Sequence, residues 1–189
     1  MRSSWLNAPN IVTLSRLILA GALFVLIDRG YSWTAATVVF VIAAATDALD
    51  GYLARRYGLV TTLGRILDPF VDKIIVCGSF VFLLAHAPKS GVNAWMVLVI
   101  LARELFITSL RGYLERQGRD FSAAWSGKVK MVVQCLAVGF ALLSMEPSVR
   151  LSGLLALRDA LLWGAVAITI YSGIDYCIRA ARMMKPETE

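Results

Sequence analysis

Long apolar stretches separated by short polar ones dominate the chain. Six of them reach the length of about 17–25 residues that a helix needs to cross the hydrocarbon core of a membrane. They cover residues 11–27, 33–53, 63–86, 92–114, 129–145 and 160–178. Lipid leaves unpaired backbone groups without partners, so each stretch is expected to be a helix. The pattern predicts an all-α integral membrane protein with six transmembrane helices, in which residues 1–189 form one domain.

Composition supports a membrane protein. Of the 189 residues, 58% are hydrophobic and 17% are charged, against about 45–50% and about 25% in a typical soluble domain. These values argue against a water-soluble enzyme, a disordered tail and a nucleic-acid-binding module. The single histidine and three scattered cysteines leave no spacing typical of a zinc or redox site.

The distribution of Lys and Arg predicts the topology. If the N-terminus is cytoplasmic, most basic residues fall on the cytoplasmic side, and only Arg29, Lys89, Arg150 and Arg158 fall on the other. The cytoplasmic set is Arg2, Arg16, Arg55, Arg56, Arg65, Arg111, Arg116, Arg119, Lys128, Lys130, Arg179, Arg182 and Lys185. This bias predicts that both termini face the cytoplasm. It also explains the net charge of +6 without a nucleic-acid partner.

Four of the acids lie in one predicted helical hairpin, where carboxylates at membrane depth usually mark a functional site. Asp47 and Asp50 are three residues apart and share a face of the second helix, while Asp68 and Asp72 are four apart and share a face of the third. A short turn around residues 57–62 joins the two helices. At about 1.5 Å rise per residue both pairs reach a similar depth, so the four carboxylates are expected to converge.

Convergent carboxylates repel one another unless a positive charge lies between them. Hard divalent cations prefer such oxygens, and two metals sharing carboxylates form a clamp for phosphoryl chemistry. Gly51 permits close approach to the backbone, and Arg55 could bind a diphosphate through two hydrogen bonds. The competing interpretation is a buried charge network that only holds the two helices together.

The stretch from Asp47 to Asp72 reads DALDGYLARRYGLVTTLGRILDPFVD. It resembles, without mismatch, the signature of the CDP-alcohol phosphotransferases, D-x2-D-G-x2-A-R-x8-G-x3-D-x3-D. The matching positions are Asp47, Asp50, Gly51, Ala54, Arg55, Gly64, Asp68 and Asp72. The family has a six-helix membrane fold, which agrees with the six apolar stretches.

The resemblance implies roles for these residues and two bound ions, Mg²⁺ or Mn²⁺. Asp47 and Asp68 would bridge both metals, Asp50 would bind the first and Asp72 the second, and Asp72 would also be the general base. Contacts to the CDP part of CDP-diacylglycerol are implied for Gly51, Arg55, Thr61, Pro9, Asn10 and Thr13. The family also implies a homodimer surrounded by membrane lipids.

Three further stretches resemble the phosphatidylglycerophosphate synthase branch of the family. They are NAPNIVTLSR at residues 7–16, the segment from Ala102 through Glu104 to Arg111, and SGKVK at residues 126–130 with Gln134. Met131 departs from that branch, which usually has Thr there. The resemblance implies phosphatidyl transfer from CDP-diacylglycerol to sn-glycerol 3-phosphate, giving phosphatidylglycerol phosphate and CMP. It also implies a bacterial inner membrane location with the active site facing the cytoplasm.

A cluster of basic residues suits an acceptor that carries a phosphate. The candidates are Arg103, Arg111, Lys128 and Lys130. Inositol phosphate, or phosphatidylglycerol as in a cardiolipin synthase, remain alternative acceptors, and serine is disfavoured. The alternative interpretation of Arg111 is a basic residue near a cytoplasmic loop. That of Arg103 is a structural ion pair with a buried acid. A cation-coupled transporter would need repeated halves and broken helices, which the sequence lacks.

Overall fold

The computed structural model describes residues 8–57, 62–119, 121, 124–149 and 152–184, with side chains described outside 8–13 and 47–69. The described chain is helical, without strands, as the sequence predicts. The helices are α1 (Ala8–Arg29), α2 (Trp33–Tyr57), α3 (Thr62–Leu84), α4 (Ala87–Ser90), α5 (Ala94–Arg116), α6 (Trp125–Ser144) and α7 (Leu154–Met184). Each of the six apolar stretches corresponds to one long helix, and α4 is a single extra turn between the third and fourth.

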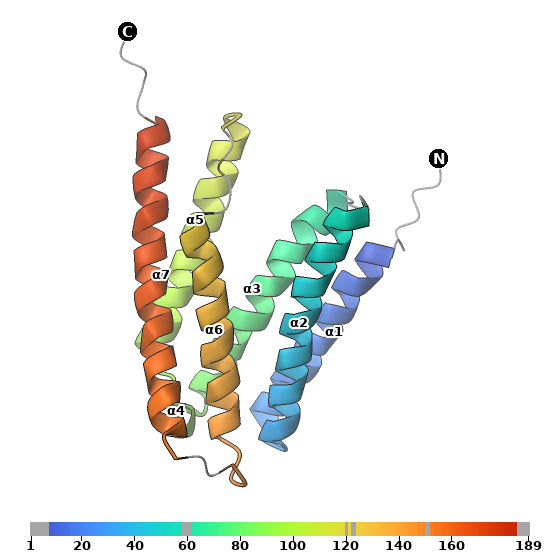
Figure 1. Cartoon of the computed structure of the whole chain (residues 1–189), viewed down its shortest axis with the longest axis vertical. Helices are drawn as coiled ribbons and strands as arrows, with labels where there is room; N and C mark the ends of the chain where they lie inside the picture. Colours follow the sequence, from blue (N-terminus) through green and yellow to red (C-terminus); the bar gives the residue numbers. More distant parts are fainter. Residues whose placement is uncertain (1–7, 58–61, 120, 122–123, 150–151, 185–189) are drawn as a thin grey trace.

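Two layers of helices meet along α3 (Figure 1). Helix α1 packs on α2 and α3, while α7 packs on α5 and α6. Contacts of α3 with α5 and α6, and of α2 with α6, join the two groups. The start of α1 and the end of α7 lie at the same end of the bundle, together with the α5–α6 connection (Figure 1). We call this the upper end.

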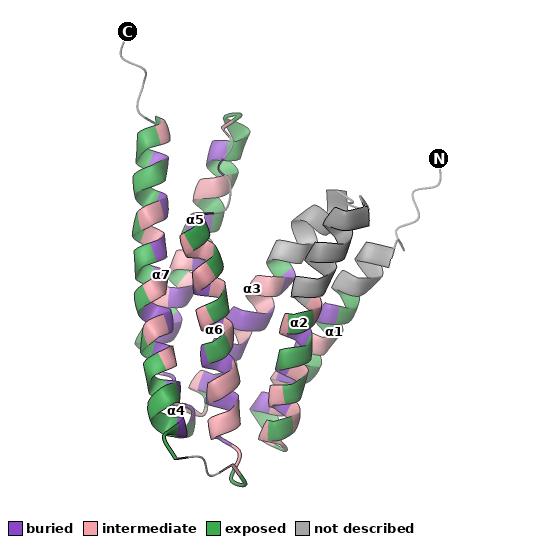
Figure 2. Ribbon diagram, in the orientation of Figure 1, coloured by how far each residue is buried: buried purple, intermediate pink, exposed green. Residues whose placement is uncertain are grey.

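Apolar side chains fill the interior and also cover much of the exterior. The main core includes Leu23, Phe40, Phe80, Ile100 and Leu142, each at most 2% exposed. Outward-facing positions are exposed along the long helices (Figure 2), and many of them are apolar, including Ile18 at 74% and Trp163 at 60% exposed. An apolar exterior is typical of helices that face lipid.

Membrane-crossing capacity is clearest in the last two helices. Among the described residues, α6 and α7 are long and apolar enough by length and composition to span a bilayer, and Trp33–Thr46 of α2 is a shorter apolar segment. The remaining predicted spans stay predictions.

The predicted bounds of the last helix are too narrow. Helix α7 begins at Leu154 and ends at Met184, whereas the apolar stretch covers only 160–178. The added first turns contain Arg158, which donates to Asp159 and, at 2.8 Å, to the carbonyl of Lys89. Gly91 (φ +76°) ends α4 where a Cβ would lie 2.8 Å from Arg158 Nε. These contacts satisfy the Arg158 side chain, so the helix can begin before its apolar stretch.

Candidate active site

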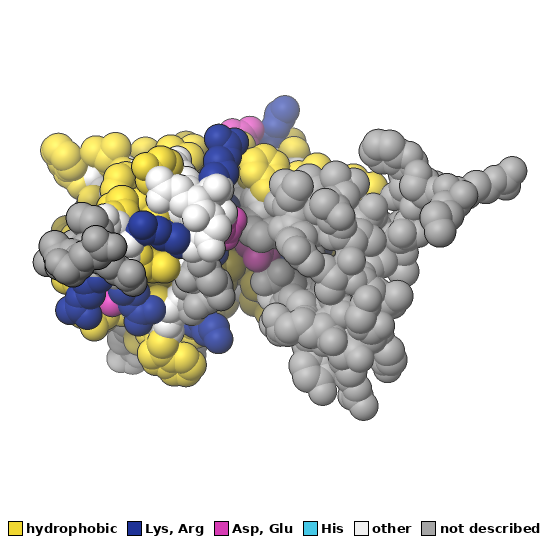
Figure 3. Space-filling view, turned by 90° about the horizontal axis from the view of Figure 1, so that it is seen from above, with side chains coloured by type: hydrophobic (Ala, Val, Ile, Leu, Met, Phe, Trp, Pro, Cys, Tyr) yellow, Lys and Arg dark blue, Asp and Glu magenta, His cyan; other side chains and the backbone are white. Residues whose placement is uncertain are grey.

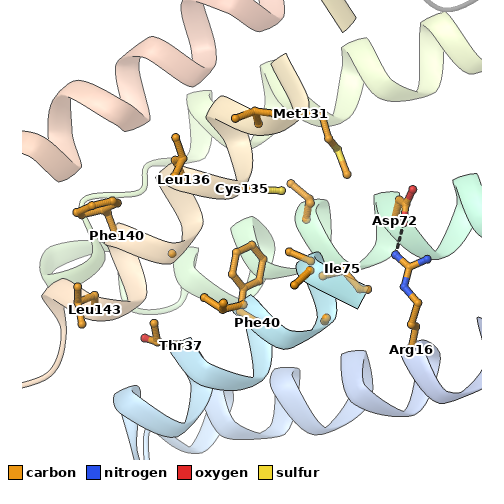
Figure 4. A pocket seen from close by; sticks show the side chains of 17 residues that line it. Arg16, Thr37, Phe40, Asp72, Ile75, Met131, Cys135, Leu136, Phe140 and Leu143 are labelled. Carbon is orange, nitrogen blue, oxygen red and sulfur yellow. Dashed lines mark hydrogen bonds and ion pairs between the residues drawn. The ribbon is translucent and has the colours of Figure 1, made fainter. Parts of the chain in front are cut away.

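The four predicted metal-binding aspartates lie on two neighbouring helices. Asp47 and Asp50 belong to α2, Asp68 and Asp72 belong to α3, and these helices pack against each other. Of the four side chains, only that of Asp72 is described. Its carboxylate forms an ion pair with Arg16 of α1, whose side chain is 2% exposed (Figure 4).

Most predicted CDP-diacylglycerol contacts lie outside the described side chains. Pro9, Asn10 and Thr13 belong to α1, and Gly51 and Arg55 to α2, but their side chains are not described. Thr61 lies outside the described residues altogether.

An apolar cavity of about 520 Å³ lies between α2, α3 and α6. Phe40, Met131 and Phe140 are among its lining side chains, and Arg16 and Asp72 lie together at one end (Figure 4). The cavity therefore combines an apolar length with one charged end. An amphipathic molecule also has an apolar part and a charged end, so its shape and polarity match this cavity.

A second cavity, of about 640 Å³, lies between α3, α5, α6 and α7, and basic side chains outnumber acidic ones in its lining. Its wall contains all four predicted acceptor-binding residues, namely Arg103, Arg111, Lys128 and Lys130. Asp72 lines this cavity too. The tertiary structure thus brings the basic residues of α5 and α6 to the candidate base on α3, which sequence spacing could not establish.

Glu104 organises two of these basic residues. Its buried carboxylate accepts a hydrogen bond of 2.9 Å from Arg103 Nη1 and pairs with the Lys130 ammonium. Arg103 also donates to Ser172 Oγ at 2.6 Å. A buried charge is tolerated when it is paired and hydrogen-bonded. Glu104 therefore stabilises the Arg103 and Lys130 side chains in the cavity wall.

The guanidinium groups retain donor capacity. The Nε atoms of Arg103 and Arg111 are buried and have no hydrogen-bond partner among the described residues. Such unpaired buried N–H groups are uncommon. Guanidinium and ammonium groups bind phosphate oxygens well, so the basic side chains in this wall suit a phosphate.

Two further residues of this wall have no assigned role from the sequence. Lys73 donates to Thr108 Oγ1, and Tyr176 of α7 also lines the cavity. The apolar pattern gives α7 no feature that distinguishes Tyr176 from other helical aromatics. Glu104, by contrast, adjoins Arg103 in sequence, and this neighbouring acid could have indicated an ion pair with Arg103.

The donor set suits divalent metals. Two pairs of carboxylates, each pair about one turn apart on packed helices, offer the oxygens that Mg²⁺ and Mn²⁺ prefer. Within the described side chains no group of three or more candidate ligands comes together, because three of the four aspartates are outside that set.

Upper-end surface charge agrees with an anionic ligand. Lys and Arg side chains gather over the α5–α7 group, with apolar side chains around the rim (Figure 3). Lys128, Arg116, Arg179 and Arg182 are exposed there. The basic cavity thus lies among charges of the same sign, which attract anions from solution.

The chain is similar to several known phosphatidyltransferases. The chain is 36% identical over 186 residues to a CDP-diacylglycerol–glycerol-3-phosphate 3-phosphatidyltransferase of Bacillus subtilis, covering 90% of this chain and 93% of the relative. It is 33% identical to the Escherichia coli K12 protein of the same name, covering 93% and 95%. A probable phosphatidylglycerophosphate synthase of Mycobacterium tuberculosis is 34% identical, with 93% and 82% covered.

The family model of the CDP-alcohol phosphatidyltransferases matches residues 6–171. This range includes both aspartate pairs and the basic residues of α5 and α6. The chain therefore belongs to the CDP-alcohol phosphatidyltransferase family.

Proposed function

We propose that this protein transfers a phosphatidyl group from CDP-diacylglycerol to sn-glycerol 3-phosphate, releasing phosphatidylglycerol phosphate and CMP. The names of its relatives support both substrates. One structural observation carries the proposal: Asp72 borders both the apolar cavity and the basic cavity. A lipid donor and a charged acceptor could therefore meet at this carboxylate.

The apolar cavity suits the acyl chains of the donor, with the diphosphate at the end where Asp72 and Arg16 lie. We assign the CDP part to Gly51, Arg55 and Thr61, and to Pro9, Asn10 and Thr13 at the start of α1. The family signature supports this assignment for Gly51 and Arg55, which are two of its fixed positions, and the wider resemblance to the family supports it for the other four.

Asp47, Asp50, Asp68 and Asp72 would hold two divalent cations, Mg²⁺ or Mn²⁺. Such ions neutralise a diphosphate and stabilise the charge of the departing CMP. Donor-set chemistry supports this proposal, since hard cations prefer carboxylate oxygens.

Acceptor binding falls to the basic cavity, where Arg103, Arg111, Lys128 and Lys130 would hold the phosphate of glycerol 3-phosphate. Asp72 then takes the proton of the acceptor hydroxyl. The hydroxyl oxygen forms a bond to the phosphorus attached to diacylglycerol, and the bond from that phosphorus to the CMP oxygen breaks. Proton transfer concerted with attack makes a carboxylate an adequate base.

We further propose six membrane spans, both termini and the active site at the cytoplasmic face of a bacterial inner membrane, and a homodimer. Two observations support the orientation. The start of α1 and the end of α7 share the upper end (Figure 1). Most of the basic residues belong to that end, while Arg29 at the end of α1, Lys89 in α4 and Arg158 near the start of α7 belong to the other.

The direct test is CMP release by purified protein given CDP-diacylglycerol, Mg²⁺ or Mn²⁺, and a panel of acceptors. Glycerol 3-phosphate should release CMP, and serine should not. EDTA should abolish the reaction, and added Mg²⁺ or Mn²⁺ should restore it. Preference for inositol phosphate or phosphatidylglycerol would contradict the acceptor assignment, and no CMP with any acceptor would overturn the proposed reaction.

A further inference from the structure

Tyr176 of α7 is a buried aromatic residue in the wall of the basic cavity. It is 2% exposed. The guanidinium carbon of Arg103 lies 5.2 Å from the centre of its ring, and that of Arg111 lies 5.9 Å away. Both distances fall within the range of about 6 Å for cation–π attraction. One ring therefore attracts two of the proposed acceptor-binding cations.

The phenol oxygen of Tyr176 makes two further contacts. It accepts a hydrogen bond of 3.2 Å from Arg111 Nη2 and one of 2.8 Å from the backbone N–H of Ala124. Ala124 is the N-cap residue of α6 and is 2% exposed. A phenol oxygen has two lone pairs for hydrogen bonds, so both are used and together they join α5 to the start of α6.

Gly127 shows how closely α6 approaches this oxygen. A Cβ at Gly127 would lie 3.0 Å from the Tyr176 hydroxyl, which is closer than ordinary packing allows. The first turn of α6 therefore rests against the phenol. Lys128 follows directly and Lys130 comes two residues later, so their backbone depends on this contact.

Tyr176 also offsets the repulsion between the like charges of Arg103 and Arg111. Arg103 and Arg111 are eight residues apart on α5, about 12 Å along the helix axis, and their like charges favour separation. Glu104 compensates Arg103. For Arg111, the hydrogen-bond partner in the described part of the chain is the Tyr176 hydroxyl, which therefore determines where this guanidinium points.

We propose that Tyr176 is a positioning residue for acceptor binding: it holds Arg103 and Arg111 at one wall of the cavity and anchors the α6 turn that carries Lys128. The inference rests on the proposed function, because it assigns the acceptor phosphate to this cavity. Tyr176 lies beyond residue 171, where the family match ends.

The test compares Tyr176→Phe, which removes only the hydroxyl, with Tyr176→Leu, which also removes the ring. Tyr171, on the same helix and 63% exposed, provides matched controls as Tyr171→Phe and Tyr171→Leu. Steady-state CMP release should give a KM for glycerol 3-phosphate raised about tenfold in Tyr176→Phe, the size expected for losing one hydrogen bond to a charged group. The increase should be larger in Tyr176→Leu.

The same Tyr176 variants should keep kcat and the KM for CDP-diacylglycerol within about twofold of wild type. An unchanged acceptor KM in Tyr176→Phe overturns the inference, as does a loss of kcat alone or an equal rise of both KM values, which a purely structural role would produce. If Tyr176→Leu fails to fold, the isosteric Phe variant decides. If wild-type protein releases no CMP with glycerol 3-phosphate, the proposed function itself is wrong. If wild-type turnover is normal and Tyr176→Phe has the same acceptor KM, only the role of Tyr176 is rejected.

Discussion

At the residue scale, the side chains proposed for the chemistry also form buried ion pairs. Arg16, on α1, forms an ion pair with the Asp72 carboxylate. This pair limits the directions in which the carboxylate can point. Across the basic cavity, Glu104 pairs with Arg103 and Lys130. Substitutions here should therefore separate residues needed for chemistry from residues that also stabilise the fold.

Asp72→Asn should lower kcat by about 10²–10⁴-fold, the usual contribution of a general base. An amide cannot take the acceptor proton, yet it nearly matches the carboxylate in size, so the variant should still fold. Loss of the ion pair with the buried Arg16 should lower its unfolding temperature. CMP release measures the first effect, and thermal unfolding measures the second. Asp28→Asn, at an exposed carboxylate near the other end of α1, is the control. Full activity of Asp72→Asn would exclude the assignment.

Lys128 and Lys130 should respond differently to substitution by Gln. Lys128 is exposed, so Lys128→Gln should raise the KM for glycerol 3-phosphate about tenfold, as expected for a lost charged contact, with little change in thermal stability. Lys130 is buried against Glu104, and removing one partner of a buried pair costs about 3–5 kcal/mol. Lys130→Gln should therefore also unfold at a lower temperature. An acceptor KM unchanged in both variants would argue for an uncharged acceptor.

At the element scale, the helices are joined by polar contacts at their ends as well as by apolar packing. Asn93 caps α5 by accepting from the Met96 N–H at 3.0 Å. The loop after α6 reaches the start of α2, where Glu146 Oε2 accepts from the backbone N–H and the hydroxyl of Thr34 at 3.1 and 2.8 Å. Helix starts have unpaired N–H groups and favour nearby negative charge, so Glu146 acts as a cap supplied by another element.

Glu146 gives this cap a pH dependence. The hydrogen bonds from Thr34 lower the pKa of the Glu146 carboxyl below its ordinary value of 4.5. A lowered folded-state pKa means that the stabilisation is complete well above pH 4.5 and is lost as the pH falls through the lowered value. Glu146→Gln should therefore unfold at a slightly lower temperature than wild type at pH 7, and the difference should shrink below about pH 4.5.

Thermal unfolding of both proteins across pH 3–7 measures this effect. Glu115→Gln, at an exposed carboxylate in the last turn of α5, controls for the loss of a surface negative charge alone. A Glu146→Gln difference that stays constant down to the lowest pH would contradict the capping role.

At the scale of the whole molecule, alternate connections lie at opposite ends of the bundle. The α5–α6 connection lies at the upper end and the α6–α7 connection at the lower end (Figure 1). Positive charge concentrates at the upper end, and loops rich in Lys and Arg stay in the cytoplasm. The two ends should therefore face different compartments.

Single-cysteine labelling tests this orientation. In a background without Cys77, Cys135 and Cys177, a cysteine at Pro147, in the α6–α7 connection, should react with a membrane-impermeant maleimide added to intact bacterial cells. A cysteine at Gln117, in the α5–α6 connection, should react only after the membrane is permeabilised. The reverse pattern would invert the proposed topology.

Much of the architecture follows from the sequence alone. Apolar stretches of membrane-crossing length predict the six long helices, because helical hydrogen bonding within each stretch is local. The aspartate spacing predicts which carboxylates share a helix face, for the same local reason. The start of α7 was predicted too late, because the contact of Arg158 with the Lys89 carbonyl depends on a distant turn.

Only the tertiary structure decides which helices meet around the basic cavity. Arg103, Lys130 and Tyr176 lie on three different helices, and nothing in their spacing brings them to one wall with Asp72. Packing of α3, α5, α6 and α7 does so. The sequence by itself determined the helices, the charge bias and the aspartate register, because these depend on neighbours in the chain. Helix packing decided the cavities, the Glu104 pairs and the place of Tyr176, because those depend on contacts between residues far apart in sequence.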